Sequence, residues 1–254
     1  MHERVPFNSL IIEKSFIELG LPIQDIYTLK DNPEVIVRAG MYDEYDGTED
    51  RYGCFQEHLD NRDLLNKLQD QYGLFIPDFD IVVGGHKRFY IVTQRVHGVN
   101  LHYRTFAEDE ADEAKGKLDK FYSTLGDVLI DAAQSGGKMI GDLTRAGADK
   151  SGNKQWVYGK RKGDLENQVW LVDLGPCVTE YIPPHDKIFC INQFPWLFEM
   201  IVESEKKLGC RFDEAREKVL DYLKTERSTF SDTDLIARQI DMFFRHQQMF
   251  GNIL

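Results

Sequence analysis

The spacing of apolar residues changes near residue 100, and this change constrains the fold more than any other feature of the sequence. Residues 1–100 contain short runs of β-branched and aromatic residues between turn residues, the pattern of strands. Residues 101–135 and 187–254 carry apolar residues at three- and four-residue steps, the pattern of amphipathic helices. The sequence therefore predicts an α+β protein with a strand-rich first part and a mostly helical second part.

The first part contains several short strands and one helix. We expect strands over 15–19, 25–30 and 34–38, a helix over 53–71, and a hairpin over 81–94. The helix is predicted because Leu64, Leu65 and Leu68 share one face. The hairpin is predicted because a Gly-Gly pair separates two apolar runs.

The second part begins with the clearest helix of the chain, over 108–134, which Ser-Gly-Gly at 135–137 ends. We expect two strands to follow, over 155–158 and 168–172, and then three helices, near 195–208, 212–226 and 232–249. The last helix carries an apolar face that is expected to be core, made of Leu235, Ile236, Ile240, Phe243, Phe244 and Met249.

Two aspartates have sequence surroundings typical of catalytic or metal-binding residues. Asp142 lies in a Gly-Asp-Leu turn after the long helix, and Asp173 ends the apolar run Val169-Trp-Leu-Val. A carboxylate at the end of a buried strand is costly unless it is paired or binds a metal ion, and Mg²⁺ favours one or two carboxylates together with phosphate oxygens. A strand-end aspartate that caps a turn is the alternative for Asp173.

Composition and charge limit the classes of partner that this chain is expected to bind. The chain has 254 residues and a formal charge of −12, so it gains little from the counterion release that drives nonspecific nucleic-acid binding. No apolar run approaches the roughly 20 residues that a membrane-spanning helix needs. The basic segment Lys154–Lys162 is interpreted as a solvated hairpin tip, with contact to an acidic substrate or a phosphate as the alternative.

The same features favour a cytoplasmic protein. The N-terminus lacks a basic segment followed by an apolar one, so we expect no signal peptide. The four cysteines form no CxxC pair, which suits reduced thiols and makes a zinc site unlikely on spacing alone. Export as an effector by a route without a cleaved signal stays open.

From Ser15 to Phe198, the order of these elements resembles the protein-kinase-like superfamily. It is most similar to small, divergent members such as aminoglycoside and choline phosphotransferases and minimal bacterial effector kinases. The resemblance implies two lobes, a β-rich N-lobe with one helix over 1–97 and a helical C-lobe over 98–254. It also implies ATP and Mg²⁺ or Mn²⁺ as cofactors, and transfer of the γ-phosphoryl group to a hydroxyl on a protein or a small molecule.

In the N-lobe, the resemblance assigns residues to the phosphates of ATP. The segment Phe16–Tyr27 resembles the glycine-rich strand-turn-strand, of which only Gly20 survives. Arg38 stands where the family carries a lysine, and Lys30 on the preceding strand is the alternative cation. Glu57 matches the helix glutamate that holds this cation.

The segment Tyr90–Leu101 resembles the last N-lobe strand and the hinge. By this match Thr93 is the gatekeeper, and the backbones of Gln94 and Val96 face the adenine edge. Gly98 would let the chain turn into the C-lobe.

In the C-lobe, the resemblance makes Asp142 the catalytic base and Asp173 the main metal ligand. The family carries an asparagine five residues after the catalytic aspartate, but glycine occupies position 147 here. Asn153, which follows an insertion, is the candidate second metal ligand. Asp186 is expected to brace the catalytic turn.

Three hypotheses remain open on the sequence. The first is an active kinase-like phosphotransferase. The second is a pseudokinase that binds a nucleotide or a protein, which the lost glycines, the arginine at position 38 and the displaced asparagine favour. The third is an unrelated α+β interaction protein, without a cleft between the two parts.

Overall fold

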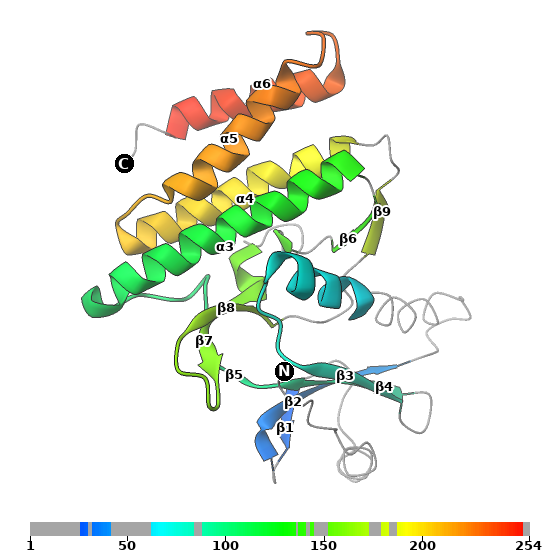
Figure 1. Ribbon diagram of the computed structural model, residues 1–254, viewed down its shortest axis with the longest axis vertical. Helices are drawn as coiled ribbons and strands as arrows, with labels where there is room; N and C mark the ends of the chain where they lie inside the picture. The colour runs from blue at the N-terminus through cyan, green and yellow to red at the C-terminus, as the bar shows by residue number, and fades with distance from the viewer. Residues whose placement is uncertain are drawn as a thin grey trace.

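The computed structural model confirms the α+β class, with strands at one end of the molecule and helices at the other (Figure 1). It describes residues 26–29, 32–41, 62–83, 88–135, 137–140, 143–144, 152–172, 179–182 and 187–250. The predicted strand over 15–19 lies outside these ranges.

A four-stranded antiparallel sheet forms the strand-rich end. Its strands are β1 (Ile26–Leu29), β2 (Asn32–Met41), β3 (Phe79–Val83) and β4 (Arg88–Gln94), in the order β1-β2-β4-β3. Val37 and Val92 face each other across β2 and β4 and are fully buried. The predicted strands over 25–30 and 34–38 and the two strands of the predicted hairpin are thereby confirmed.

A helix over 62–72 is the described part of the helix predicted over 53–71. Its Leu65 and Leu68 are buried and belong to the same apolar cluster as the long helix that follows in the chain. After this helix, Phe75 forms an isolated parallel bridge with Trp170, and the Phe75 carbonyl accepts a hydrogen bond from Leu171 N at 3.0 Å. The first part of the chain is therefore attached to strands of the second part.

A second sheet lies between the first sheet and the helices (Figure 1). It contains β5 (Val96–Asn100), β7 (Trp156–Arg161) and β8 (Gln168–Leu171), in the order β5-β7-β8. The change from one sheet to the other falls between Gln94 and Val96. Strands β7 and β8 confirm the predicted pair over 155–158 and 168–172, whereas β5 was not predicted because its exposed Val-His-Gly-Val-Asn sequence lacks an apolar face.

Gly98 does not serve as the expected turn residue. It lies within β5 opposite Gly159 of β7, and among the described glycines positive φ angles occur at Gly73, Gly163 and Gly209. A Cβ on Gly98 would lie 2.7 Å from the Gly159 Cα and closer still to the carbonyl oxygen of the residue before it. Glycine is therefore needed here for close contact between two strands, and the expectation of a turn is wrong.

A third, two-stranded sheet pairs β6 (Gly137–Ile140) with β9 (Thr179–Ile182). The pairing is antiparallel and places Ile140 opposite Thr179. Neither strand was predicted, because a four-residue strand depends on a partner that is distant in the sequence.

Four helices cover the other end: α3 (Glu108–Ser135), α4 (Lys187–Leu208), α5 (Asp213–Arg227) and α6 (Leu235–Phe250). The long helix α3 packs against both α4 and α5. The prediction placed the start of α4 near residue 195, but α4 already begins at Lys187 and contains Pro195 in its interior. Proline disfavours a helix interior, so the pattern wrongly suggested a helix start at that residue.

Only part of the predicted apolar face of α6 is core. Ile240 and Phe243 are buried, whereas the Leu235 side chain is 58% exposed. None of the helices in the described ranges combines the length and apolarity needed to cross a membrane.

Candidate functional site

The predicted site residues divide into those that the structure describes and those that it does not. Outside the described ranges lie Gly20, Lys30, Glu57, Asp142, Asp173 and Asp186. Their assigned roles stay predictions. The backbone of Arg38 lies in β2, opposite Ile91 of β4.

The residues next to the two aspartates are held by consecutive residues of one segment. Leu143 directly follows Asp142, and its carbonyl oxygen accepts a hydrogen bond from Trp156 Nε1 at 3.0 Å. Val172 directly precedes Asp173, and its N–H donates to the Gln155 carbonyl at 3.1 Å. Gln155 and Trp156 thus anchor a neighbour of each aspartate.

The strands that flank the two aspartate-bearing segments pair with one another. The segment 141–155, which contains Asp142, connects β6 to β7, and the segment 172–178, which contains Asp173, connects β8 to β9. Strand β6, before the first segment, pairs with β9, after the second segment. Strand β7, after the first segment, pairs with β8, before the second segment (Figure 1). The strands on either side of the two segments are therefore neighbours, although they are far apart in the sequence.

Thr144 and Gly152, which flank the insertion before Asn153, are in contact. A Cβ on Gly152 would lie 2.6 Å from Met200 Sδ and closer still to the carbonyl of Thr144. Thr144 in turn donates its hydroxyl to Gln193 Oε1 of α4 at 2.8 Å. Gly152, next to Asn153, is thus in contact with Thr144, two positions after Asp142 in the sequence.

Gln193 is a site residue that sequence reasoning missed. It is buried, and it fixes a residue two positions after Asp142. An uncharged glutamine inside an apolar helix carries no signal by which the sequence could have singled it out.

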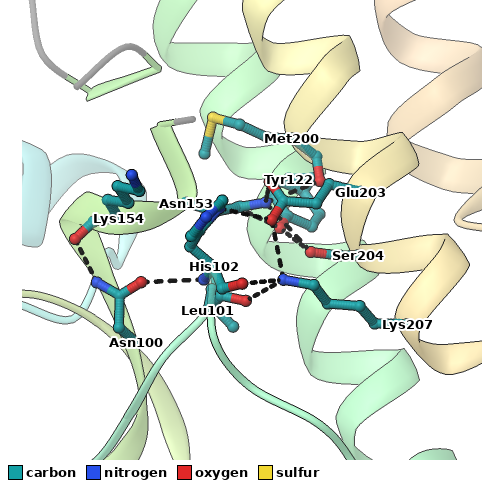
Figure 2. Close-up of polar contacts among 10 residues, drawn as sticks. All are labelled: Asn100, Leu101, His102, Tyr122, Asn153, Lys154, Met200, Glu203, Ser204 and Lys207. Atoms are coloured by element: carbon teal, nitrogen blue, oxygen red, sulfur yellow. Dashed lines mark hydrogen bonds and ion pairs between the residues drawn. The ribbon is translucent and has the colours of Figure 1, made fainter. Parts of the chain in front are cut away.

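Asn153 lies in the short 3₁₀-helix η2 (Gly152–Gln155) and its side chain is 0% exposed. Its Oδ1 accepts a hydrogen bond from the Tyr122 hydroxyl at 2.7 Å, and its Nδ2 donates to the Met200 carbonyl at 3.1 Å and to Glu203 Oε2 at 2.9 Å (Figure 2). Burial raises the pKa of the Tyr122 phenol, so this hydroxyl remains a neutral donor. Asn153 therefore connects η2 to α3 and α4.

Glu203 extends this network to the end of β5. Its Oε1 lies 2.9 Å from Lys207 Nζ and 2.8 Å from His102 Nδ1. Lys207 also donates to the carbonyls of Leu101, at 2.8 Å, and His102, at 2.5 Å (Figure 2). The turn after β5 is thereby fastened to α4.

Asn100, the last residue of β5, closes the network from the other side. Its Nδ2 donates to the carbonyl of Lys154, and its Oδ1 accepts a hydrogen bond from His102 N at 3.0 Å (Figure 2). The end of β5 is therefore attached to η2 as well as to α4.

The segment predicted to face adenine lies where the first sheet gives way to the second. Thr93 is half-buried in β4, opposite Ile36 of β2. The N–H of Gln94 donates to the Asp78 carbonyl at 2.9 Å, and its side-chain Oε1 accepts a hydrogen bond from Arg161 Nη1 at 3.2 Å. Gln94 is therefore fixed to both sheets.

The peptide groups of Val96 point away from β7. Leu101 N donates to the Trp156 carbonyl at 2.8 Å. Leu101 and Trp156, which follow the pair of Asn100 and Val157, are therefore a hydrogen-bonded pair. Hydrogen-bonded and non-hydrogen-bonded pairs alternate along an antiparallel ladder, so the Val96 and Arg161 pair is non-hydrogen-bonded. Consistent with this, Arg161 N donates instead to Asp164 Oδ2, at 3.0 Å.

The basic segment Lys154–Lys162 belongs mainly to β7 of the β7–β8 hairpin, and Lys160 and Lys162 are exposed as expected of a solvated tip. Arg161 differs from them. Its guanidinium carbon lies 4.8 Å from the centre of the Trp170 ring, and its Nε donates to Asp164 Oδ2 at 3.1 Å. This arginine stabilises the hairpin.

Hydrogen bonds of Glu34 join the first sheet to β5 and to the residue before it. His97 Nε2 lies 2.7 Å from Glu34 Oε2, and Arg95 N donates to the Glu34 carbonyl at 2.7 Å. The hydrogen bond from His97 lowers the pKa of the Glu34 carboxyl group, with weaker support from the positive charges of Lys162 and Arg95.

The lowered pKa of Glu34 predicts a pH-dependent contribution to stability. A carboxyl whose pKa is lower in the folded state stabilises the fold above its unfolded pKa, about 4.3, and loses this contribution as the pH falls through the folded pKa. Wild type should therefore melt at a higher temperature than Glu34→Gln at about pH 6, and the difference should shrink as the pH falls below about 4.3. Melting curves of both proteins over this range measure it. A constant difference would contradict the assignment.

Within the described residues, no three His, Cys, Asp or Glu side chains are grouped so that they could hold a metal ion. Asp142 and Asp173 lie outside those residues. A metal site at Asp173 therefore stays a prediction.

No family model and no curated protein sequence matches the chain. A chain from the solved complex of HipA, HipB and operator DNA of the Shewanella oneidensis MR-1 toxin–antitoxin system is similar with a TM-score of 0.32 and 12% sequence identity. The similarity covers 96% of this chain and 70% of that chain. A TM-score of this size does not establish a shared fold.

Proposed function

We propose that the protein is an ATP-dependent phosphotransferase with a two-lobed, protein-kinase-like fold. The observation that supports the proposal is that the sequence neighbours of Asp142 and Asp173 are held by one short stretch of chain. Their neighbours Leu143 and Val172 are bound by the consecutive residues Trp156 and Gln155. Phosphoryl transfer needs a residue at the acceptor hydroxyl and a metal ligand at the phosphates within one site.

Chain geometry extends this observation to the aspartates. Consecutive Cα atoms are about 3.8 Å apart, so each aspartate is one residue away from an anchored neighbour. In the proposed site, Asp142 orients the acceptor hydroxyl and takes its proton. Asp173 holds Mg²⁺ or Mn²⁺ on ATP, and the metal ion when bound neutralises charge on the phosphates. Carboxylate oxygens suit this ion.

The nucleotide base is proposed to lie at the edge of β5 that faces away from β7. The peptide groups of Val96 point away from β7, which supports a role in binding the adenine edge together with the Gln94 carbonyl. Thr93 precedes them as the gatekeeper. The phosphates would be contacted by Arg38 or Lys30, with Glu57 as the partner of this cation and Gly20 in the covering turn.

A pseudokinase is the second candidate. The observation that favours it is the buried position of Asn153, whose Oδ1 accepts a hydrogen bond from Tyr122. If this amide does not reach the metal ion, one of the two ligands that the family uses is missing. A pseudokinase of this kind would bind a nucleotide or a protein partner without transferring phosphate, whereas an active enzyme would need its metal ion to be held without this amide.

A thermal-shift titration tests the nucleotide site. ATP with Mg²⁺ or Mn²⁺, at 100 times its dissociation constant, should stabilise wild type by about 2.7 kcal/mol. Asp173→Asn should lose the metal-dependent part of this shift, and the exposed-site control Asp70→Asn should keep it. The absence of a shift with any nucleotide, in well-folded wild type, would overturn both candidates as nucleotide-binding proteins.

A further inference from the structure

We propose that Asn153 is a positioning residue and not a ligand of the metal ion. Through its contacts with α3 and α4 it holds the neighbours of the two aspartates in place. This inference rests on the proposed function, because it assigns a role within that site. It is carried by the contacts of the Asn153 side chain and by the hydrogen bonds that Gln155 and Trp156, directly after it, make to Val172 and Leu143.

The hydrogen bonds determine which way the Asn153 amide faces. A carbonyl and a carboxylate only accept, so the nitrogen must face the Met200 carbonyl and Glu203, both within 3.1 Å. The oxygen then faces the Tyr122 hydroxyl, which donates its one proton to it at 2.7 Å. Ser204 Oγ, at 2.6 Å from the Tyr122 oxygen, supplies the hydrogen bond that this oxygen accepts.

These contacts place the amide among the helices. Asn153 is 0% exposed, and its side chain lies with Tyr122, Glu203 and Ser204 at the junction of η2, α3 and α4 (Figure 2). A ligand of a metal ion on ATP needs an oxygen that faces the phosphates. The Asn153 oxygen instead faces a tyrosine hydroxyl inside the helical layer.

The backbone of η2 carries the effect of Asn153 to both aspartates. Two residues after Asn153, the Gln155 carbonyl binds Val172 N, and the next residue, Trp156, binds the Leu143 carbonyl. The contacts of Asn153 with α3 and α4 therefore also hold the Gln155 carbonyl and the Trp156 indole in place. These two groups bind Val172 and Leu143, the neighbours of Asp173 and Asp142.

Two protons report this role directly: the Val172 amide and the Trp156 indole N–H. In Tyr122→Phe and in Asn153→Asp, we expect about tenfold faster hydrogen exchange at both protons by NMR, with little change at the Ala215 amide in α5. Tyr122→Phe removes only one hydroxyl, so this variant keeps the test valid if Asn153→Asp does not fold. Tyr222→Phe is the matched control, because it removes the hydroxyl of a buried tyrosine in α5.

Metal dependence separates the two roles of Asn153. The half-saturating metal concentration for the nucleotide-dependent thermal shift should stay within about twofold of wild type in Tyr122→Phe and Asn153→Asp. In the same variants, kcat for phosphate release from ATP should fall about tenfold while KM for ATP is unchanged, because positioning acts on the reacting groups and not on nucleotide binding.

Two results would overturn the inference. One is an about tenfold change in half-saturating metal in Asn153→Asp with none in Tyr122→Phe, which would make Asn153 a ligand. The other is unchanged exchange at Val172 and Trp156 in both variants. Failure of the proposed function is a separate result, since wild type would then show no nucleotide-dependent shift while the exchange rates still decide whether Asn153 holds the two segments.

Discussion

Replacing Trp156 with alanine is expected to lower the free energy of unfolding by about 3–5 kcal/mol, the cost typical of removing a large buried aromatic side chain. Trp156 is 0% exposed, and its ring centre lies 4.6 Å from that of Phe121 in α3. Its indole N–H also binds the Leu143 carbonyl. Urea unfolding of wild type and Trp156→Ala measures the loss.

A conservative pair of variants separates packing from positioning. Trp156→Phe keeps a ring but leaves the Leu143 carbonyl without this donor, at a cost of about 1–3 kcal/mol. Trp170→Phe removes an equivalent donor to the Gly159 carbonyl within the same hairpin. We expect similar losses of stability in both, but a loss of phosphate transfer in Trp156→Phe alone. Equal activity in the two variants would contradict the role given to Trp156.

Arg216→Ala is expected to destabilise the protein by about 3–5 kcal/mol, because it leaves a buried carboxylate unpaired. Glu205 at the end of α4 is 0% exposed, and Arg216 of α5 binds both of its oxygens, with Nε at 2.6 Å from Oε1. The Phe212 N–H also donates to Oε1, at 2.8 Å. The guanidinium carbon lies 4.9 Å from the centre of the Phe198 ring, so packing is lost together with charge.

The exposed pair nearby provides the control. Arg211 lies 3.4 Å from Asp213, and both side chains are more than half exposed. Arg211→Ala should therefore change the free energy of unfolding by less than about 1 kcal/mol. If the two arginine variants lost equal stability, the burial of Glu205 would not be the cause, and the account of the α4–α5 contact would be wrong.

Strong local patterns were sufficient to predict several elements. The long helix over 108–134 appears as α3, since apolar residues repeat along it and Ser-Gly-Gly follows it. The hairpin of β7 and β8 and the strands β1 to β4 were also expected, because β-branched residues and turn signals delimit them.

Elements that depend on distant partners could not be predicted from the sequence. Strands β5, β6 and β9 are short, and each pairs with a segment far along the chain. The start of α4 was misplaced because Pro195 lies inside a helix whose packing tolerates it.

In the candidate site, too, local sequence patterns were sufficient for some residues and contacts between distant residues decided the rest. The two aspartates were singled out by their local settings, but their supports were not. Gln193 and Tyr122 act through contacts to Thr144 and Asn153, which only the folded chain reveals. Asn153 was selected as the first asparagine after Asp142, whereas the contact of Gly152 with Thr144 across the intervening residues could not be read from the sequence.

The central claim is tested most directly by phosphate transfer from γ-labelled ATP, followed as phosphate release and as label on the chain itself, in wild type and Asp142→Asn. We expect metal-dependent transfer by wild type and a loss of about 10²- to 10⁴-fold in Asp142→Asn, with nucleotide binding retained. Wild type that binds ATP and transfers no phosphate to either acceptor, or Asp142→Asn that transfers it at the wild-type rate, would contradict the account.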